Sequence, residues 1–375
     1  MQNLLPEATP RANGRGAAHR AGWTVALFLM TTFATLSPAC AQNGAVDKPA
    51  PAARKLSAQV IMTRESFNGW NDAYKLSNGT AEVVIVPQIG RIMRFGFVGA
   101  PNLLWTNDAE SGKPGVATGG WRNFGGDKPW PWSQDDWTKW FGADWPPPPE
   151  ADQLPQTVTL VGTGTVRLVS PTIPKIGCRI VREITLAETG ARLFITTHLE
   201  RVTDANTDPV SAWTITQTPF TRTPLVAHLD TSGTTFAEGW RVMGDKQPVK
   251  SVKRSDDGVL LMVERDPEAK GGRKLGFDGD SITGVIGDTL LTIRADSPGA
   301  KNFDWRPGER GQIYISDAGA PYIEWEFTSP LIALKKGESA TLHTTFEAVR
   351  LPMDISAMPA MEAAARGSQS KGKKQ

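Results

Sequence analysis

Two glutamates near the C-terminal end of the chain have a spacing that suits acid–base chemistry. Residues 322–327 read Tyr-Ile-Glu-Trp-Glu-Phe, and this alternation predicts a β-strand with Tyr322, Glu324 and Glu326 on one face. Side chains two residues apart on a strand lie roughly 7 Å from each other, so one carboxylate can raise the pKa of the other and keep a proton available for transfer. The residues leave a second interpretation open, in which two solvated glutamates share an exposed face.

A tryptophan-rich segment has the composition of a ligand-binding surface. Six of the thirteen tryptophans lie between Trp121 and Trp145, interleaved with carboxylates, amides and cations. Indole faces cover the C–H surface of a sugar ring, and the polar groups can bind its hydroxyls. In the alternative interpretation the indoles cap a core or contact another protein. The predicted carbohydrate-binding residues are Arg122, Asn123, Trp130, Trp132, Gln134 and Trp137.

The same segment supplies candidates for a second catalytic group. Asp127 and Lys128 can act as the acid that an enzyme needs beside Glu326 or Glu324. Asp135 and Asp136 are alternatives for glycoside hydrolysis, which needs two carboxyl groups across the scissile bond. Because the segment is rich in Gly and Pro, we expect a long irregular loop and neither a helix nor a central strand.

The elements that would position these groups are strands. Period-two patterns dominate residues 61–351, and we expect this range to form one large domain. A weak Ala-rich helical candidate lies at Met358 to Ala365. The pattern predicts an all-β fold of large antiparallel sheets packed face to face, a β-supersandwich. Good examples of predicted strands are Thr157–Val161, Val166–Ser170, Arg179–Leu186, Arg192–Leu199, Thr289–Arg294, Gln312–Ser316, Tyr322–Phe327 and Thr341–Val349.

The N-terminal residues predict export. Three arginines precede an apolar run from Trp23 to Leu36, which leads to Ala39-Cys40-Ala41, so residues 1–41 are interpreted as a secretory signal peptide. The run is short for a membrane span, and we expect none after cleavage. The predicted location is periplasmic or secreted, with a lipoprotein held through Cys40 as the minor alternative.

The flanks of the domain differ from it in composition. Residues 42–60 are rich in Ala and Pro and predict a linker. Residues 352–375 end in a lysine-rich stretch with Gly and Ser, for which we expect a disordered basic tail.

Charge and motifs exclude several classes of partner. Of 41 basic and 39 acidic residues, three basic and one acidic lie in residues 1–41, so the remainder is formally neutral and nucleic acid is not an expected partner. The Gly pairs near residue 120 lack phosphate-loop spacing, which predicts no nucleotide and no cofactor. The segment that starts at Asp204 resembles the start of a calcium-binding loop. Pro209 occupies the position where such a loop requires glycine, so no metal is expected. Cys178 is interpreted as a buried structural thiol.

Two segments resemble a known family. Val83-Val84-Ile85-Val86-Pro87 through Asn102-Leu103-Leu104-Trp105 is similar to the opening hairpin of galactose mutarotase-like proteins, and Tyr322 through Ser339 resembles their closing strands. More narrowly, Lys274-Leu275-Gly276 and Gly126-Asp127-Lys128 resemble a bacterial group of mutarotase-like domains of unassigned function. The resemblance covers Phe67 to Leu351 and implies a β-supersandwich whose concave face holds a carbohydrate.

The resemblance also bears on chemistry. It places Glu326 or Glu324 near the late glutamate that takes the anomeric hydroxyl proton in mutarotases. The histidine that the family supplies as an acid is missing, because Thr216-Gln217-Thr218 stands where it is expected. We therefore predict an exported carbohydrate-binding protein, and leave open whether it is a sugar epimerase or glycan-processing enzyme, such as a lyase or glycoside hydrolase. The alternative is a non-catalytic structural or protein-interaction domain.

Overall fold

The computed structural model describes residues 59–366 except for 119, 222, 231–237, 245–248, 250, 269, 297–308, 318–320 and 353–356. All described residues belong to one compact unit, Leu56–Gln375. The predicted signal peptide, most of the predicted linker and residues 367–375 of the tail lie outside the described residues.

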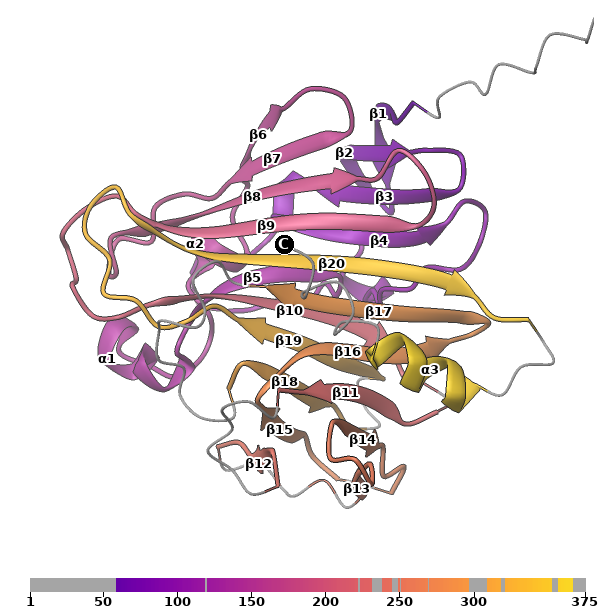
Figure 1. Cartoon of the computed structure of the whole chain (residues 1–375). Coiled ribbons are helices and arrows are strands. Elements are labelled where there is room, and N and C mark those ends of the chain that lie inside the picture. The colour runs from indigo at the N-terminus through magenta and orange to yellow at the C-terminus, as the bar shows by residue number, and fades with distance from the viewer. Residues whose placement is uncertain are drawn as a thin grey trace, which may run out of the picture. The chain divides into compact units, whose positions relative to one another are not determined.

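One ten-stranded antiparallel sheet carries the residues that matter most for chemistry (Figure 1). In the order of their pairing, its strands are β1 (Ile61–Phe67), β2 (Trp70–Ser77), β3 (Ala81–Val86), β4 (Arg91–Phe97), β5 (Asp127–Trp132), β10 (Ser211–Pro219), β19 (Tyr322–Thr328), β18 (Gly311–Ile315), β15 (Arg273–Phe277) and β12 (Trp240–Val242). We call it the first sheet.

The second sheet also has ten antiparallel strands and packs against the first. Its strands, in order of pairing, are β13 (Ser251–Arg254), β14 (Leu260–Glu264), β11 (Leu225–Leu229), β16 (Gly279–Ile286), β17 (Thr289–Asp296), β20 (Ser339–Arg350), β9 (Arg192–Arg201), β8 (Cys178–Leu186), β7 (Thr165–Val169) and β6 (Thr157–Leu160). The short helices are η1 (Pro87–Ile89), η2 (Asp108–Glu110), η3 (Gln134–Asp136), α1 (Trp137–Phe141) and α2 (Pro149–Asp152).

Alternation of side chains explains how the sheets pack. Along β20, buried and accessible residues alternate from Ala340 to Ala348, and the buried set enters a core shared by the two sheets. The eight strands predicted from period-two patterns are all present, within two residues at either end. The prediction of an all-β antiparallel sandwich is confirmed.

The tryptophan-rich segment differs from the expected loop. Residues 127–132 form β5, a strand in the middle of the first sheet, and Trp137–Phe141 form the short helix α1. β5 pairs with β10 from Asp127 to Trp132 but with β4 only at Asp127. The rest of its β4 side behaves as a sheet edge, which tolerates Pro129 and Pro131 because no ladder hydrogen bond is needed from them.

Part of the expected disordered tail is helical. Residues Ala357–Arg366 form α3, which contains the weak helical candidate of the sequence and packs on β16 and β11. Met361 and Ala365 are fully buried there, so apolar contact holds this helix to the second sheet. Among the helices of the described chain, none is long and apolar enough to cross a membrane.

Candidate functional site

The outer face of the first sheet, opposite the shared core, carries the candidate site. On β19 the core side is formed by alternate apolar residues, which leaves Glu324 and Glu326 on the outer face. Glu324 lies opposite Tyr314 of β18, and Tyr314 lies opposite Lys274 of β15. Glu326 lies opposite Gln312. Register therefore brings residues from distant parts of the chain into two adjacent rows.

The first of two lysine–glutamate pairs joins β5 to β19. Lys128 Nζ lies 3.3 Å from Glu324 Oε1, and Gln217 Nε2 donates to the same oxygen at 2.9 Å. The lysine side chain is 1% exposed and that of the glutamate 14%. Burial lowers the pKa of Lys128, and Arg91 lowers it further, although Glu324 opposes both. In this pair the carboxylate is the accessible member.

The second pair has the opposite arrangement. Lys274 Nζ donates to Glu326 Oε2 at 2.8 Å, and Trp213 Nε1 donates to the same oxygen at 2.9 Å. Here the glutamate is fully buried and the lysine side chain is 13% exposed. Burial raises the pKa of Glu326 to about 7, with Lys274 acting against it and Glu324 adding to it. The ammonium is the accessible member.

Three buried oxygens on this face lack a hydrogen-bond donor within the described chain. They are Glu326 Oε1, Gln312 Oε1 and Gln217 Oε1. All three oxygens are closed to solvent, and a buried acceptor without a donor costs free energy.

Tryptophans enclose both lysines. The ammonium of Lys128 lies 4.8 Å from the ring centre of Trp130, and that of Lys274 lies 4.9 Å from the ring centre of Trp213. The Trp130 and Trp213 rings meet edge to face at 5.3 Å. Each ammonium is thus held by a carboxylate and by the negative face of an indole.

Asp152 of α2 fixes the first group of indoles. Its carboxylate accepts hydrogen bonds of 2.7 Å from Trp121 Nε1 and from Trp130 Nε1, and it forms an ion pair with Arg91, also at 2.7 Å. Asp152 and Arg91 are both fully buried. Loss of one partner would leave a buried charge uncompensated, so these four side chains form one unit behind Lys128.

The other border of the site is also aromatic. Trp105 lies against Tyr322 with ring centres 4.7 Å apart, and Tyr314 lies 6.3 Å from Tyr322. Burial and nearby carboxylates raise the pKa of Tyr314 to about 12, and that of Tyr322 is also raised although Asn123 contacts it. Both phenols therefore stay neutral and can donate hydrogen bonds.

Asp127 does not lie in this site, although the sequence made it a catalytic candidate. Its side chain points to the opposite face of β5 from Lys128, pairs with Arg182 of the second sheet and accepts a 2.8 Å hydrogen bond from Thr216. It is 1% exposed. This geometry corrects the expectation, because strand alternation sends neighbouring residues to opposite faces, and Asp127 links the two sheets.

The predicted sugar-binding residues are spread over several environments. Asn123 reaches Tyr322 at the border of the site, whereas Arg122 pairs with Glu110. Gln134 donates to the backbone of Asp144 near α1. Neither contact brings Arg122 or Gln134 to the glutamates.

The predicted stacking tryptophans are buried. Trp137 is fully buried and donates to the carbonyl of Pro131, so it is a core residue and offers no face to a ligand. Trp130 and Trp132 are 5% and 4% exposed, and they shape the surroundings of the two lysines. Of the six indoles in this segment, that of Trp145 is the most exposed, at 44%.

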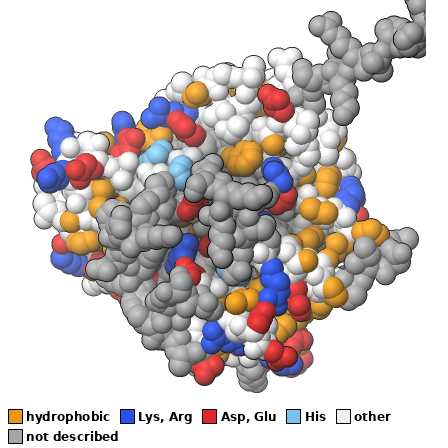
Figure 2. All heavy atoms as spheres, in the orientation of Figure 1, with side chains coloured by type: hydrophobic (Ala, Val, Ile, Leu, Met, Phe, Trp, Pro, Cys, Tyr) orange, Lys and Arg blue, Asp and Glu red, His pale blue; other side chains and the backbone are white. Residues whose placement is uncertain are grey.

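Histidines lie elsewhere. His198 and His343 project from the outer face of the second sheet, where each Nδ1 bonds to a threonine hydroxyl; Figure 2 shows histidine side chains side by side on this face. His228 of β11 bonds to Asp280. Among the described residues, no group of three or more His, Cys, Asp or Glu side chains could hold a metal.

Sequence reasoning missed Lys274 as a site residue, as well as Arg91, Asp152 and the two glutamines. Lys274 and Gly276 were noted for the family resemblance alone. The signal that can identify Lys274 is strand alternation around Leu275, which is fully buried, together with its position opposite Tyr314. The alternation is visible in the sequence, but the strand pairing is not.

No protein-family model matches this chain, and no curated protein does. Solved structures do match. A galactose mutarotase-like protein from Lactobacillus casei ATCC 334 is 11% identical, with a TM-score of 0.49 over 74% of this chain and 100% of that chain. An aldose epimerase homologue from C. elegans is 9% identical, with a TM-score of 0.41 over 78% of this chain and 100% of its own.

A heparinase III also matches, at 10% identity and a TM-score of 0.34, over 78% of this chain and 37% of that chain. At such identities the likeness concerns the fold alone. The two large antiparallel sheets agree with the architecture that the sequence led us to expect. In fold, the chain resembles galactose mutarotase-like proteins.

Proposed function

We propose that this protein binds a carbohydrate on the outer face of its first sheet and catalyses proton transfer at a sugar ring, in the manner of an aldose epimerase. The observation that carries the proposal is the inverted burial of the two lysine–glutamate pairs, which presents one carboxylate and one ammonium on the same face. Epimerisation of a hemiacetal needs one base and one acid, held on either side of the reacting bond.

Glu324 has the features of the base. Within the described part of the chain, the lysine and glutamine contacts both reach Oε1, so Oε2 can face a ligand. Lys128 lies behind the carboxylate and forms an ion pair with it. In the proposed step Oε2 takes the proton of the anomeric hydroxyl while the bond between the anomeric carbon and the ring oxygen breaks, which yields the open-chain aldehyde.

Lys274 has the features of the acid. Its accessible ammonium gives a proton to the ring oxygen as that bond breaks, and takes it back when the ring closes on the other face of the aldehyde. Glu326 holds the ammonium through Oε2. Glu326 and the amides of Gln217 and Gln312 are buried on this face and support the pair from behind, so the accessible groups that can bind sugar hydroxyls are the Glu324 carboxylate and the Lys274 ammonium.

This assignment provides an acid although the histidine expected from the family resemblance is missing. Thr216 and Thr218 are buried on the core side of β10, whereas Gln217 faces the site and donates to Glu324. A lysine from another strand takes the role that the family resemblance gave to a histidine. Export remains part of the proposal, and amino-terminal sequencing of the protein recovered from a periplasmic extract should begin at Gln42.

The test is polarimetry of freshly dissolved α-galactose and α-glucose, with and without the protein. We expect accelerated mutarotation that is lost in Glu324→Gln and retained in Glu82→Gln, a glutamate of β3 with similar exposure, 15%, that is also ion-paired, with Arg94. Sugar binding without acceleration would favour a binding protein that uses the same face. If no sugar binds in a thermal-shift screen, a structural or protein-interaction domain becomes the better assignment.

A further inference from the structure

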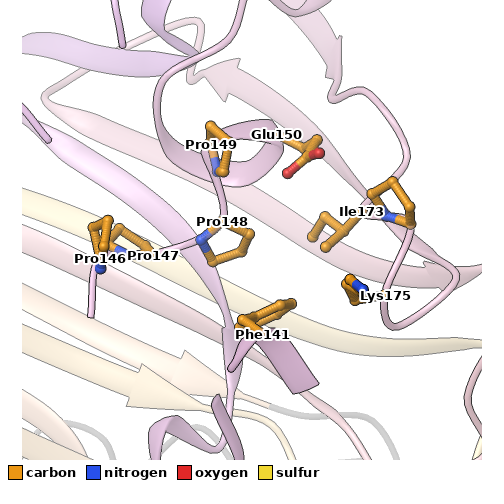
Figure 3. A pocket seen from close by; sticks show the side chains of 9 residues that line it. Phe141, Pro146, Pro147, Pro148, Pro149, Glu150, Ile173 and Lys175 are labelled. Atoms are coloured by element: carbon orange, nitrogen blue, oxygen red, sulfur yellow. The ribbon is translucent and has the colours of Figure 1, made fainter. Parts of the chain in front are cut away.

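A cavity lies beside the tryptophan-rich segment, outside the site described above. It has a volume of about 240 Å³ and is lined by residues 146–149, together with Phe141, Ile173 and the charged residues Glu150 and Lys175. In Figure 3, Glu150 and Phe141 lie on opposite sides of this space, with Ile173 and Lys175 along a third. Flat apolar faces beside a few polar groups are the usual composition of a small-ligand site.

The two charged groups of this cavity have no partner among the residues that the structure describes. Neither Glu150 nor Lys175 forms a hydrogen bond or an ion pair with any described residue. A second cavity, of about 510 Å³ at the turn between β8 and β9, differs in this respect. There Arg192 already pairs with Glu347 at 2.9 Å. Only the first of these two cavities therefore presents an unpaired cation and an unpaired carboxylate together.

An exposed indole joins the first cavity to the candidate site. Trp145 directly precedes Pro146 of the lining, and its ring meets those of Trp121 and Trp130 at 4.8 and 5.9 Å. Trp130 in turn contacts the ammonium of Lys128. An aromatic path therefore runs from the first lysine–glutamate pair to the wall of the cavity.

The same short helix serves both places. α2 contributes Pro149 and Glu150 to the cavity and Asp152 to the indoles behind Lys128. Because Glu150 lines the cavity and the fully buried Asp152 holds the indoles, this helix fixes the position of the cavity wall relative to the first lysine–glutamate pair.

We propose that this cavity is a second sugar subsite, which binds a remote unit of an oligosaccharide whose reducing unit reacts at Glu324 and Lys274. The inference rests on the proposed function and names its substrate class as oligosaccharides. The ring face of the remote unit packs on Phe141 and the prolines, Trp145 stacks on the intervening unit, and Glu150 and Lys175 bind hydroxyls.

The test compares the full chain with a Glu150→Gln/Lys175→Ala double variant. Calorimetry with galactose- and glucose-based oligosaccharides of one to six units measures binding, and polarimetry measures turnover at the reducing end. We expect affinity to increase with chain length in the parent. In the double variant, we expect longer oligosaccharides to lose about tenfold or more in affinity, because one hydrogen bond to a charged group already accounts for about tenfold, and we expect monosaccharides to be unaffected.

Glu188→Gln, at the wall of the second cavity, is the matched control and should bind all lengths as the parent does. Equal affinity for all lengths, or a double variant that binds long and short sugars as the parent does, would overturn the subsite and leave the proposed function standing. If no sugar of any length binds to the parent chain, both proposals fail together.

Discussion

The two lysine–glutamate pairs of the first sheet are built from the same residue types and differ in which partner is buried. In the Lys128–Glu324 pair the lysine is buried and the carboxylate is accessible. In the Lys274–Glu326 pair the carboxylate is buried and the lysine is accessible. Burial disfavours the charged form of whichever group it covers. The comparison shows that one sheet can expose a carboxylate and an ammonium together by inverting which member of the same pair is buried.

The largest expected effect is that of Glu324→Gln. If Glu324 is the base, its loss should reduce kcat by about 10²–10⁴-fold, the usual contribution of a positioned base. The melting temperature should fall as well, because the buried Lys128 ammonium loses its counter-charge, so kcat is compared at a temperature below both melting transitions. Polarimetry and a thermal melt measure the two quantities. A larger loss in Glu326→Gln than in Glu324→Gln at every pH would reverse the roles of the two pairs.

Lys274→Met should come next. It removes the accessible ammonium and keeps most of the apolar stem, so we expect kcat to fall by about 10²-fold, the lower end of the range for a positioned acid. Glu326 acts by holding this ammonium, so the residual activity should no longer rise as pH increases through about 7. A residual profile that keeps the parent's limb would show that the limb does not arise from positioning of Lys274.

Glu326→Gln should change the pH dependence of kcat more than the maximum value of kcat. The pKa of Glu326 is raised to about 7, and the ionised form is the one that holds the Lys274 ammonium. Activity of the parent should rise as pH increases through about 7, and this limb should disappear in the variant. At the optimum the loss should be at most about tenfold, as expected for a residue that acts by positioning another.

The same variant has a stability signature. A carboxyl group whose pKa is raised by folding binds more protons in the folded chain than in the unfolded one, so its stabilising contribution is complete below the unfolded value of 4.5 and is lost as pH rises towards 7. Melting temperatures between pH 4 and 8 should decline less in Glu326→Gln than in the parent. Parallel curves would indicate that Glu326 titrates at its ordinary pKa.

Lys128→Met should have the smallest effect on rate, within about tenfold, because Gln217 still donates to Glu324. Its effect is on stability. Burial lowers the pKa of Lys128, so the unfolded chain holds this proton to higher pH than the folded chain, and the parent should gain stability as pH rises towards 10.5. Thermal melts from pH 7 to 10 should show less gain in the variant. An unstable variant would mean that the buried ion pair contributes more than an apolar replacement.

Much of the fold could be predicted from local sequence pattern. The alternation of Tyr322 to Phe327 correctly placed Glu324 and Glu326 on one face, because strand geometry fixes the direction of successive side chains. Residues 127–132 were not recognised as a strand, since two prolines normally exclude a central position. The sheet tolerates these prolines because β5 pairs with β4 only at Asp127. Nothing in the sequence of residues 127–132 indicates that this pairing is so short.

The candidate site was harder to predict than the fold. The sequence predicted that Lys128 and Asp127 lie beside Glu326 or Glu324. Lys128 does lie next to Glu324, whereas Asp127 faces the other sheet. Lys274 reaches Glu326 only because β15, β18 and β19 are neighbours. The register between strands that lie far apart in sequence is set by packing of the whole sheet, and the periodicity of any one segment does not contain it.

The carboxylate of Asp152 has a consequence for how such a sequence can change over evolutionary time. It accepts hydrogen bonds from two indoles and pairs with one guanidinium. Replacement of any one of these residues would therefore leave a buried polar group of another without its partner. Substitutions at Arg91, Trp121, Trp130 and Asp152 should therefore be tolerated only as a block. Among descendants of a common ancestor, we expect these four residues to be kept together or replaced together. A homologue that lacks one of them should have different residues at the other three positions behind Lys128.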